Sequence, residues 1–244
     1  MPTFIHGKAI RLWVDQYDFA RYFRDITVNN SVATAEITGF SSVAKEYIVG
    51  LEEGTISLQG FYESTALVGT DQYFGTILGV ATKQKVIIAI NGHNLGTRAV
   101  MALVDTSSYN LNGSLGDVAK ADVTFVSSSN AVEQGILLTI GAAISATGLG
   151  TGVDNGALTS NGGVGFLSVP VDSRNGTVIV KIQHSVDNST FADLVTFTTV
   201  VAATPTSERI EVAAGTTINR YLRVSYTVAG TTGSATPVVA FSRR

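Results

Sequence analysis

Residues 37–63, ITGFSSVAKEYIVGLEEGTISLQGFYE, constrain the fold of this 244-residue chain more than any other stretch. Residues 55–61 alternate, with Ile56 and Leu58 on one side and polar side chains on the other, which is the pattern of a half-buried strand. The acidic and glycine residues at 52–54 predict a turn just before it. The stretch therefore predicts two strands with a connection between them.

The predicted connection, residues 40–51, is more apolar than a loop that only reverses the chain. It carries Tyr47, Ile48 and Leu51 among small and charged residues. Exposed apolar side chains in a loop are typical of a contact surface. We therefore expect these side chains to pack against another protein surface.

The same stretch carries a resemblance. From Phe40 it reads Phe-Ser-x-x-Ala-Lys-x-Tyr-Ile-x-Gly-Leu-x-Glu-Gly-Thr, and the strand that follows ends in Gly-Phe. Over residues 40–61 this resembles the subunit motif of tail-tube proteins of tailed bacteriophages and their relatives. The resemblance implies a loop that packs on a neighbouring subunit, strands that join a barrel around a central channel, and rings that are hexameric. The implied inter-subunit contacts fall on Phe40, Lys45, Glu46, Tyr47, Ile48 and Leu51.

The composition predicts an all-β protein, to which the pattern of residues 64–79 adds one helix. Charged residues make up only 14% of the chain, and 25 glycines accompany many Val, Thr and Ser, as in β-rich proteins with many turns. So few charges favour a surface that is partly covered by partners, although a neutral monomer coated with Ser and Thr is the alternative. Cysteine is absent, which excludes disulfides and thiolate metal sites.

We expect three parts along the chain. Residues 1–145 are predicted as a tail-tube-like β-barrel or sandwich with one helix near 64–79, whose Leu67 and Phe74 share a face and which Gly79 would end. Residues 85–90, KVIIAI, predict a strand buried on both sides that pairs with residues 99–104. Residues 146–162, rich in Gly, Ser and Thr, are predicted as a linker, and residues 163–244 as a C-terminal β-sandwich.

The C-terminal part carries a second, fold-level resemblance. Residues 183–191, QHSVDNSTF, and residues 219–224, NRYLRV, resemble the jelly-roll sandwiches appended to phage structural proteins, and similar sandwiches occur in carbohydrate-binding modules. A fold likeness does not assign a function. Whether this part binds a glycan therefore stays open.

No catalytic, cofactor or metal site is predicted. His6, His93 and His184 lack metal-ligand spacing, and each is interpreted as a structural or surface residue. The acidic pair at 52–53 is interpreted as a solvated turn rather than a cation site or half of a carboxylate pair. The cluster of Asp187, Asn188 and Asp193 is either a calcium site or a polar hairpin turn, and the turn is favoured.

Charge is unevenly distributed along the chain. Residues 1–155 hold nine Lys/Arg against fourteen Asp/Glu, whereas residues 156–244 hold seven against five. A basic patch that would neutralise DNA phosphates is not visible. If the barrel lines a DNA channel, we expect an acidic lumen, with Asp25, Glu36 and Asp122 as candidate lining residues. Three arginines of the second part are candidates for a basic, partner-facing surface, or for ordinary strand-edge charge: Arg209, Arg220 and Arg223.

The leading hypothesis is a virion structural protein that forms stacked rings of a tail tube and lets DNA pass without specific binding. The runner-up is a capsid decoration protein with a similar fold, and the third is a glycan-binding surface module. A hydrolase is disfavoured because no nucleophile with its base and no acid–base pair is legible. The N-terminus shows no signal peptide, and no run reaches the roughly 18 apolar residues of a membrane span. We therefore expect synthesis in the host cytoplasm, incorporation into the virion and no membrane contact.

Overall fold

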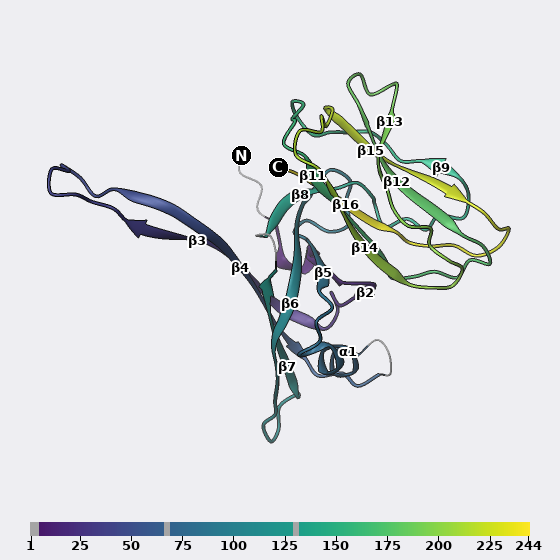
Figure 1. Ribbon diagram of the computed structural model, residues 1–244. Coiled ribbons are helices and arrows are strands. Elements are labelled where there is room, and N and C mark those ends of the chain that lie inside the picture. Colours follow the sequence, from purple (N-terminus) through teal and green to yellow (C-terminus); the bar gives the residue numbers. More distant parts are fainter. Residues whose placement is uncertain (1–4, 66–68, 129–131) are drawn as a thin grey trace. The chain divides into compact units, whose positions relative to one another are not determined.

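The computed structural model describes residues 5–65, 69–128 and 132–244. In these residues the protein is all-β apart from one α-helix and one turn of 3-10 helix, which confirms the predicted fold class (Figure 1). The chain divides into two compact units that are described separately. Unit 1 comprises residues 1–20, 85–101 and 133–244, and unit 2 comprises residues 21–84 and 102–132. The division into residues 1–145, 146–162 and 163–244 stays a prediction.

Unit 1 contains most of the strands. Its elements are the 3-10 helix η1 (Gly7–Ala9), β1 (Arg11–Val14), β2 (Tyr17–Asp18), β5 (Gln84–Ala89), the first part of β6 (Arg98–Asn112), β8 (Glu133–Leu137), β9 (Gly148–Leu149), β10 (Val153–Asp154), β11 (Gly163–Val169), β12 (Val178–Ser185), β13 (Ala192–Thr196), β14 (Thr206–Val212), β15 (Tyr221–Val228) and β16 (Val238–Arg243). They form one sheet in the order β14-β11-β16-β8-β6-β5-β1-β2 and a second sheet in the order β10-β15-β12-β13, with β9 also on β15.

The two sheets of unit 1 enclose a common core. β11 shows how the sequence produces this core, because all its residues are buried and its side chains alternate between two clusters. Leu167 and Val169 pack with residues of β12 and β15, whereas Val164 and Phe166 pack on the opposite face with Trp13. The continuous apolar run of β11 is therefore that of a strand covered on both sides. The predicted strand at residues 85–90 is buried in the same way and pairs with β6.

The stretch predicted as a linker contributes to the second sheet of unit 1. β9 pairs with Ser225 and Tyr226 of β15, and β10 pairs with Tyr221 and Leu222 of the same strand. The pattern had suggested no strand because each paired segment is only two residues long, too short to show an alternation.

Unit 2 is a four-stranded antiparallel sheet with the α-helix on one face. Its elements are β3 (Phe23–Glu36), β4 (Tyr47–Phe61), α1 (Thr70–Ile77), the rest of β6 and β7 (Lys120–Ser127), and its strands follow the order β3-β4-β7-β6. Ile56 and Leu58 of β4 and Phe125 of β7 point to the covered face. Phe74 of α1 lies on this face, with its ring centroid 6.0 Å from that of Phe125.

The helix is shorter than predicted. Residues 66–68, and with them the predicted core residue Leu67, lie outside the described residues. The helix begins at Thr70, whose buried hydroxyl accepts from the Glu63 backbone N–H at 3.0 Å and donates to the Phe61 carbonyl at 3.1 Å. The Glu63 carboxylate meanwhile accepts from the Thr65 backbone N–H at 2.9 Å. These local hydrogen bonds hold residues 63–65 in a non-helical conformation, which is why the helical pattern is not followed from residue 64.

Candidate assembly surfaces

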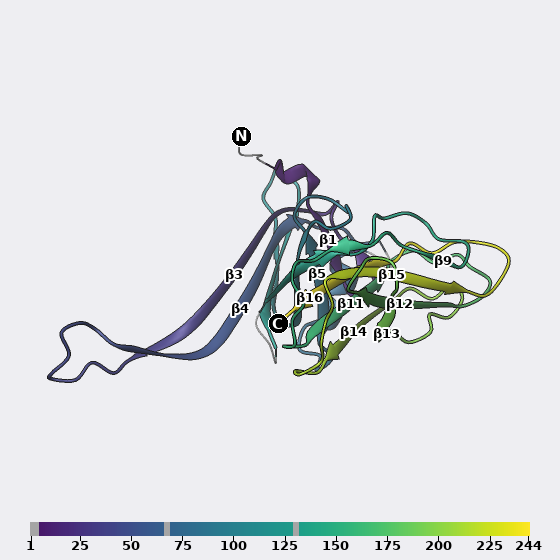
Figure 2. The same cartoon turned by 90° about the horizontal axis from the view of Figure 1, so that it is seen from above.

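The most exposed part of unit 2 is a long hairpin formed by the distal halves of β3 and β4. We call residues 29–53 the arm. Every residue of the arm is exposed except Ser42, which is half-buried. Figures 1 and 2 show the arm leaving the rest of the unit 2 sheet as a two-stranded ribbon. A ribbon of two strands with solvent on both faces is only marginally stable by itself.

The arm corrects two predictions. Residues 40–51 are not all loop, because Tyr47, Ile48 and Leu51 belong to β4, and residues 52–54 are strand rather than a turn. The loop is confined to residues 37–46 and is closed at its base by the ion pair of Lys45 with Glu36 at 3.0 Å. The predicted turn is wrong because residues 52–54 pair along the ribbon with Val32, Ser31 and Asn30, although Glu and Gly are poor strand formers.

A bulge in β4 changes which side chains share a face of the arm. Val32 pairs with Glu52 but Thr34 pairs with Val49, so that Gly50 and Leu51 together lie opposite one residue of β3. Val49 and Tyr47 consequently share the face of Val32, whereas Ile48 falls on the other face. Both faces of the arm therefore carry exposed apolar side chains.

The exposure of these side chains is large. Leu51 is 86% exposed, Val49 75% and Tyr47 53%, and at the tip Phe40 is fully exposed beside Val43. The arm is also acidic, with four glutamates against a single lysine. A contiguous set of exposed apolar residues of this kind marks an interaction surface. Val43 and Val49 were missed by sequence reasoning. The signal that would have found Val49 is Gly50, which marks a bulge inside a strand pattern.

The uncovered face of the unit 2 sheet is polar. In one cross-strand row, Asp25 pairs with Gln59, Gln59 with Asp122, and Asp122 with Asn110. The same face carries further uncharged side chains: Thr27, Asn29, Thr55, Ser57, Ser108 and Thr124. The structure thus brings together two of the three predicted lumen residues. Glu36 is not among them, because it lies at the distal end of the arm and is paired with Lys45.

Neighbours partly restrain both carboxylates of this row. Asp122 accepts a hydrogen bond from the Asn112 amide at 2.8 Å, and Asp25 lies 3.6 Å from the Arg24 guanidinium. The two charged side chains of the row are carboxylates, but Lys120, two residues before Asp122 on β7, lies on the same face and pairs with Asp117 at 2.6 Å. The face is therefore poor in charge, and its lysine is neutralised by a neighbouring carboxylate.

The three arginines predicted as a basic surface have different surroundings in unit 1. Arg209 is nearly buried between Glu133 and Glu211, and Arg220 pairs with Asp154. Of these three arginines, only Arg223 has no carboxylate at ion-pair distance among the described residues. Its guanidinium lies 3.8 Å from the centre of the Phe191 ring and donates to the Gln183 side chain at 2.9 Å. The three do not form one basic patch.

The Arg209 network predicts an acid-sensitive contribution to stability. Arg244 and then Arg209 lower the pKa of Glu211 to about 2. A carboxylate whose pKa is depressed by folding stabilises the protein above its unfolded pKa, and this contribution is lost as the pH falls from about 4.5 toward 2. We expect the urea midpoint of Glu211→Gln to fall less between pH 5 and pH 3 than that of the unchanged protein. The matched variant Glu53→Gln, on the exposed arm, should show the same fall of the urea midpoint with pH as the unchanged protein. An equal fall for all three proteins would contradict the role of Glu211.

The three histidines make local structural contacts. His6 caps η1 by accepting from the Lys8 backbone N–H at 3.1 Å, and His184 accepts from that of Asn219 at 3.2 Å. His93 lies 2.8 Å from the Thr139 hydroxyl, and burial, followed by the charge of Arg11, lowers its pKa to about 4.

The choice between a calcium site and a polar turn stays a prediction, and the structure shows what holds its two aspartates. Asp187 Oδ1 accepts from the backbone N–H groups of Ser189 and Thr190 and from the Ser185 hydroxyl. Asp193 is engaged by Lys181 and Gln183. Residues 185–190 form a polar turn, and the described residues contain no group of three or more His, Cys, Asp or Glu placed to hold a metal ion.

Over residues 5–65, 69–128 and 132–244, no helix is long and apolar enough to cross a membrane.

Comparisons with known proteins give likenesses in structure. No protein-family model matches the chain, and no curated protein sequence matches it. A structure of the anti-feeding prophage cap, described as a tube terminating cap, has a TM-score of 0.44 and 10% identity and covers 55% of this chain and 92% of its own. The virion of a native gene transfer agent particle has a TM-score of 0.42 and 17% identity, and the match covers 52% of this chain and 95% of that one. The SPP1 Dit protein is described as a paradigm of the hub adsorption apparatus in phages that infect Gram-positive hosts. It has a TM-score of 0.38 and 12% identity, and the match covers 96% of this chain and 98% of that one.

These descriptions name parts of phage-like tails and virions. Because each of these three TM-scores is below 0.5, the function proposed below rests on this chain's own residues.

Proposed function

We propose that this chain is a virion structural protein, the major subunit of a phage tail tube, which assembles into stacked rings around a DNA conduit. The observation that carries the proposal is the arm, a ribbon with apolar side chains exposed on both faces. Such a ribbon gains stability only when another surface covers it. A second copy of the chain supplies that surface in a tube, as the motif at residues 40–61 implies.

The unit 2 sheet supports ring formation through its edge. β3 pairs with β4 alone among the described residues, so its outer edge presents backbone donors and acceptors to a further strand. An uncovered strand edge is a template for pairing with another chain. In the proposed ring, sheets of neighbouring subunits join edge to edge, and the polar face with Asp25 and Asp122 lines the channel.

The proposed lumen suits passage of DNA rather than binding. Phosphate contacts require Lys or Arg, and the two cations at the polar face are already paired, Lys120 with Asp117 and Arg24 with Asp25. Repulsion from carboxylates repeated around each ring keeps the DNA from adhering to the wall. The acidic lumen of the proposal thus consists of Asp25 and Asp122, without Glu36.

The proposal is tested by sedimentation and electron microscopy of the purified chain over a wide range of concentration. Rings or tubes are expected to appear above a threshold concentration. The runner-up, a decoration protein that binds capsids, is distinguished by mixing labelled protein with empty heads and with tails. Binding to heads without tube formation would replace the tube proposal with the decoration one.

The lumen assignment gives a separate prediction. In the double variant Asp25→Lys and Asp122→Lys, assemblies should retain short duplex DNA at physiological salt, because each ring then carries paired cations along the channel. Retention should fall steeply as salt rises. The matched variant Asp25→Asn and Asp122→Asn should assemble without retaining DNA. Co-sedimentation of labelled DNA measures the difference, and equal retention by the lysine and asparagine variants would refute the assignment.

A further inference from the structure

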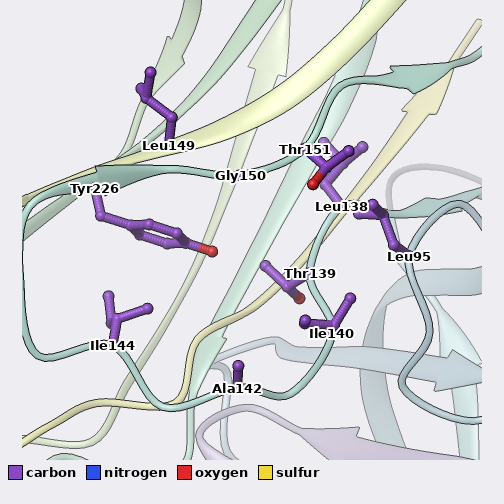
Figure 3. A pocket seen from close by; sticks show the side chains of 10 residues that line it. All are labelled: Leu95, Leu138, Thr139, Ile140, Ala142, Ile144, Leu149, Gly150, Thr151 and Tyr226. Carbon is purple, nitrogen blue, oxygen red and sulfur yellow. The ribbon is translucent and has the colours of Figure 1, made fainter.

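A cavity of about 230 Å³ opens in unit 1 between β15, the chain around β9 and the segment that follows β8 (Figure 3). Its wall is mainly aliphatic, formed by Leu95, Leu138, Ile140, Ile144 and Leu149. Gly150 lets this segment pack closely on β15, because a Cβ there would lie only 3.1 Å from the Val224 carbonyl oxygen. None of the surfaces assigned to assembly contributes to this cavity.

The Tyr226 hydroxyl is directed into the aliphatic space, and the hydroxyl of the exposed Thr151 lies at its edge. The ring of Tyr226 forms part of the wall, and Figure 3 shows its hydroxyl pointing into the cavity. Within the described part of the chain, this hydroxyl makes no hydrogen bond to the protein. Burial raises the pKa of Tyr226 to about 12, so the group is a neutral donor throughout the physiological range. A ligand that brings an acceptor into the pocket can therefore take a hydrogen bond from this hydroxyl.

The other buried hydroxyl at the wall is already engaged. Thr139 Oγ1 accepts from the Val239 backbone N–H at 3.1 Å and lies 2.8 Å from His93 Nε2. The His93 ring in turn packs edge-on against Trp13, with 5.0 Å between the ring centres. This side of the cavity is therefore fixed, and Tyr226 is left to orient a ligand.

We propose that the cavity is a binding site for a small aromatic alcohol, a single ring with a short hydroxyl-bearing substituent. The volume of the cavity indicates a single ring, because an apolar cavity of about 150 Å³ accepts benzene. This cavity is larger and has room for a short substituent in addition. Chemistry sets the substituent, because the Tyr226 hydroxyl offers a donor inside a mainly aliphatic wall. An apolar pocket with few placed polar groups is the usual form of a small-molecule site.

The test is saturation-transfer NMR of the full chain titrated with benzyl alcohol and, separately, with toluene, which lacks the hydroxyl. This readout works for a monomer and for an assembly, so its result does not depend on the proposed tube. Benzyl alcohol should bind in the millimolar range. Tyr226→Phe, which keeps the ring, should weaken benzyl alcohol about two- to tenfold, the range of one neutral hydrogen bond, and leave toluene unchanged.

Two further variants locate the site. Ala142→Leu places a larger side chain in the cavity and should abolish binding of both probes. Tyr221→Phe makes the same chemical change on β15 outside the cavity and should change neither affinity. The proposal is overturned if neither probe binds, if Tyr226→Phe leaves the affinity for benzyl alcohol unchanged, or if Ala142→Leu still binds both probes.

Discussion

Replacing Leu51 with Asp should weaken assembly at least about tenfold without destabilising the folded subunit. Leu51 is 86% exposed and lies at the bulge of β4, where it has no cross-strand partner to lose. In the subunit alone the change therefore exchanges one solvated side chain for another. In the proposed tube the same position is covered, and burying a leucine side chain contributes about 1.5–3 kcal/mol per contact.

The expected size of the effect follows from that value. Loss of the contact should raise the concentration at which assemblies form by at least about tenfold, since 1.4 kcal/mol corresponds to a factor of ten, and burial of a charge adds to the penalty. Sedimentation velocity measures assembly, and urea unfolding measures stability. Leu158→Asp is the matched control, because Leu158 is an exposed leucine of unit 1 outside the arm. Assembly of Leu51→Asp at the unchanged threshold would contradict the role of the arm.

Removing the carboxylate of Asp172 should have the largest effect on stability. Asp172 and Arg174 form an ion pair of unit 1 whose side chains are almost fully buried, with Arg174 Nη2 2.7 Å from Oδ2 and Nε 2.9 Å from Oδ1. Breaking a buried pair leaves its partner charged in a medium of low dielectric constant, and the cost is about 3–5 kcal/mol. Asp172→Ala should lower the free energy of unfolding by that amount.

A double variant separates the loss of attraction between the two charges from the cost of leaving one charge buried without its partner. Replacing both residues, as Asp172→Ala with Arg174→Leu, should restore most of the stability, because no charge is then left buried. Asp154→Ala breaks the exposed pair with Arg220 and should leave the urea midpoint nearly unchanged. If Asp172→Ala were as stable as the unchanged protein, or if the double variant were less stable than the single one, the account of this pair would be wrong.

Periodic burial explains which parts of the fold could be predicted. The alternation at residues 55–61 correctly placed Ile56 and Leu58 on the buried face, and the apolar run at residues 85–90 correctly indicated a strand covered on both sides. The distal arm lacked this signal. Its strand residues face solvent on both sides, so no core imposes an alternation, and Glu52, Glu53 and Gly54 suggested a turn.

The candidate site was predictable only where local sequence determines contacts. Phe40, Tyr47 and Leu51 were found because an exposed apolar side chain is visible in sequence as an apolar residue among polar ones. The row that joins Asp25 to Asp122 depends on the pairing of three strands, which a single sequence does not show. The ion pairs that neutralise Arg209 and Arg220 join residues far apart in the chain and were invisible for the same reason.

The central claim is that copies of this chain cover one another's arms and together enclose an acidic channel. A cryo-electron microscopy reconstruction of the assembled protein tests it most directly. The account predicts stacked rings in which residues 29–53 are buried against a neighbouring subunit and Asp25 and Asp122 face a continuous lumen. A reconstruction with the arm in solvent, with a lumen lined mainly by Lys and Arg, or with no lumen would contradict it.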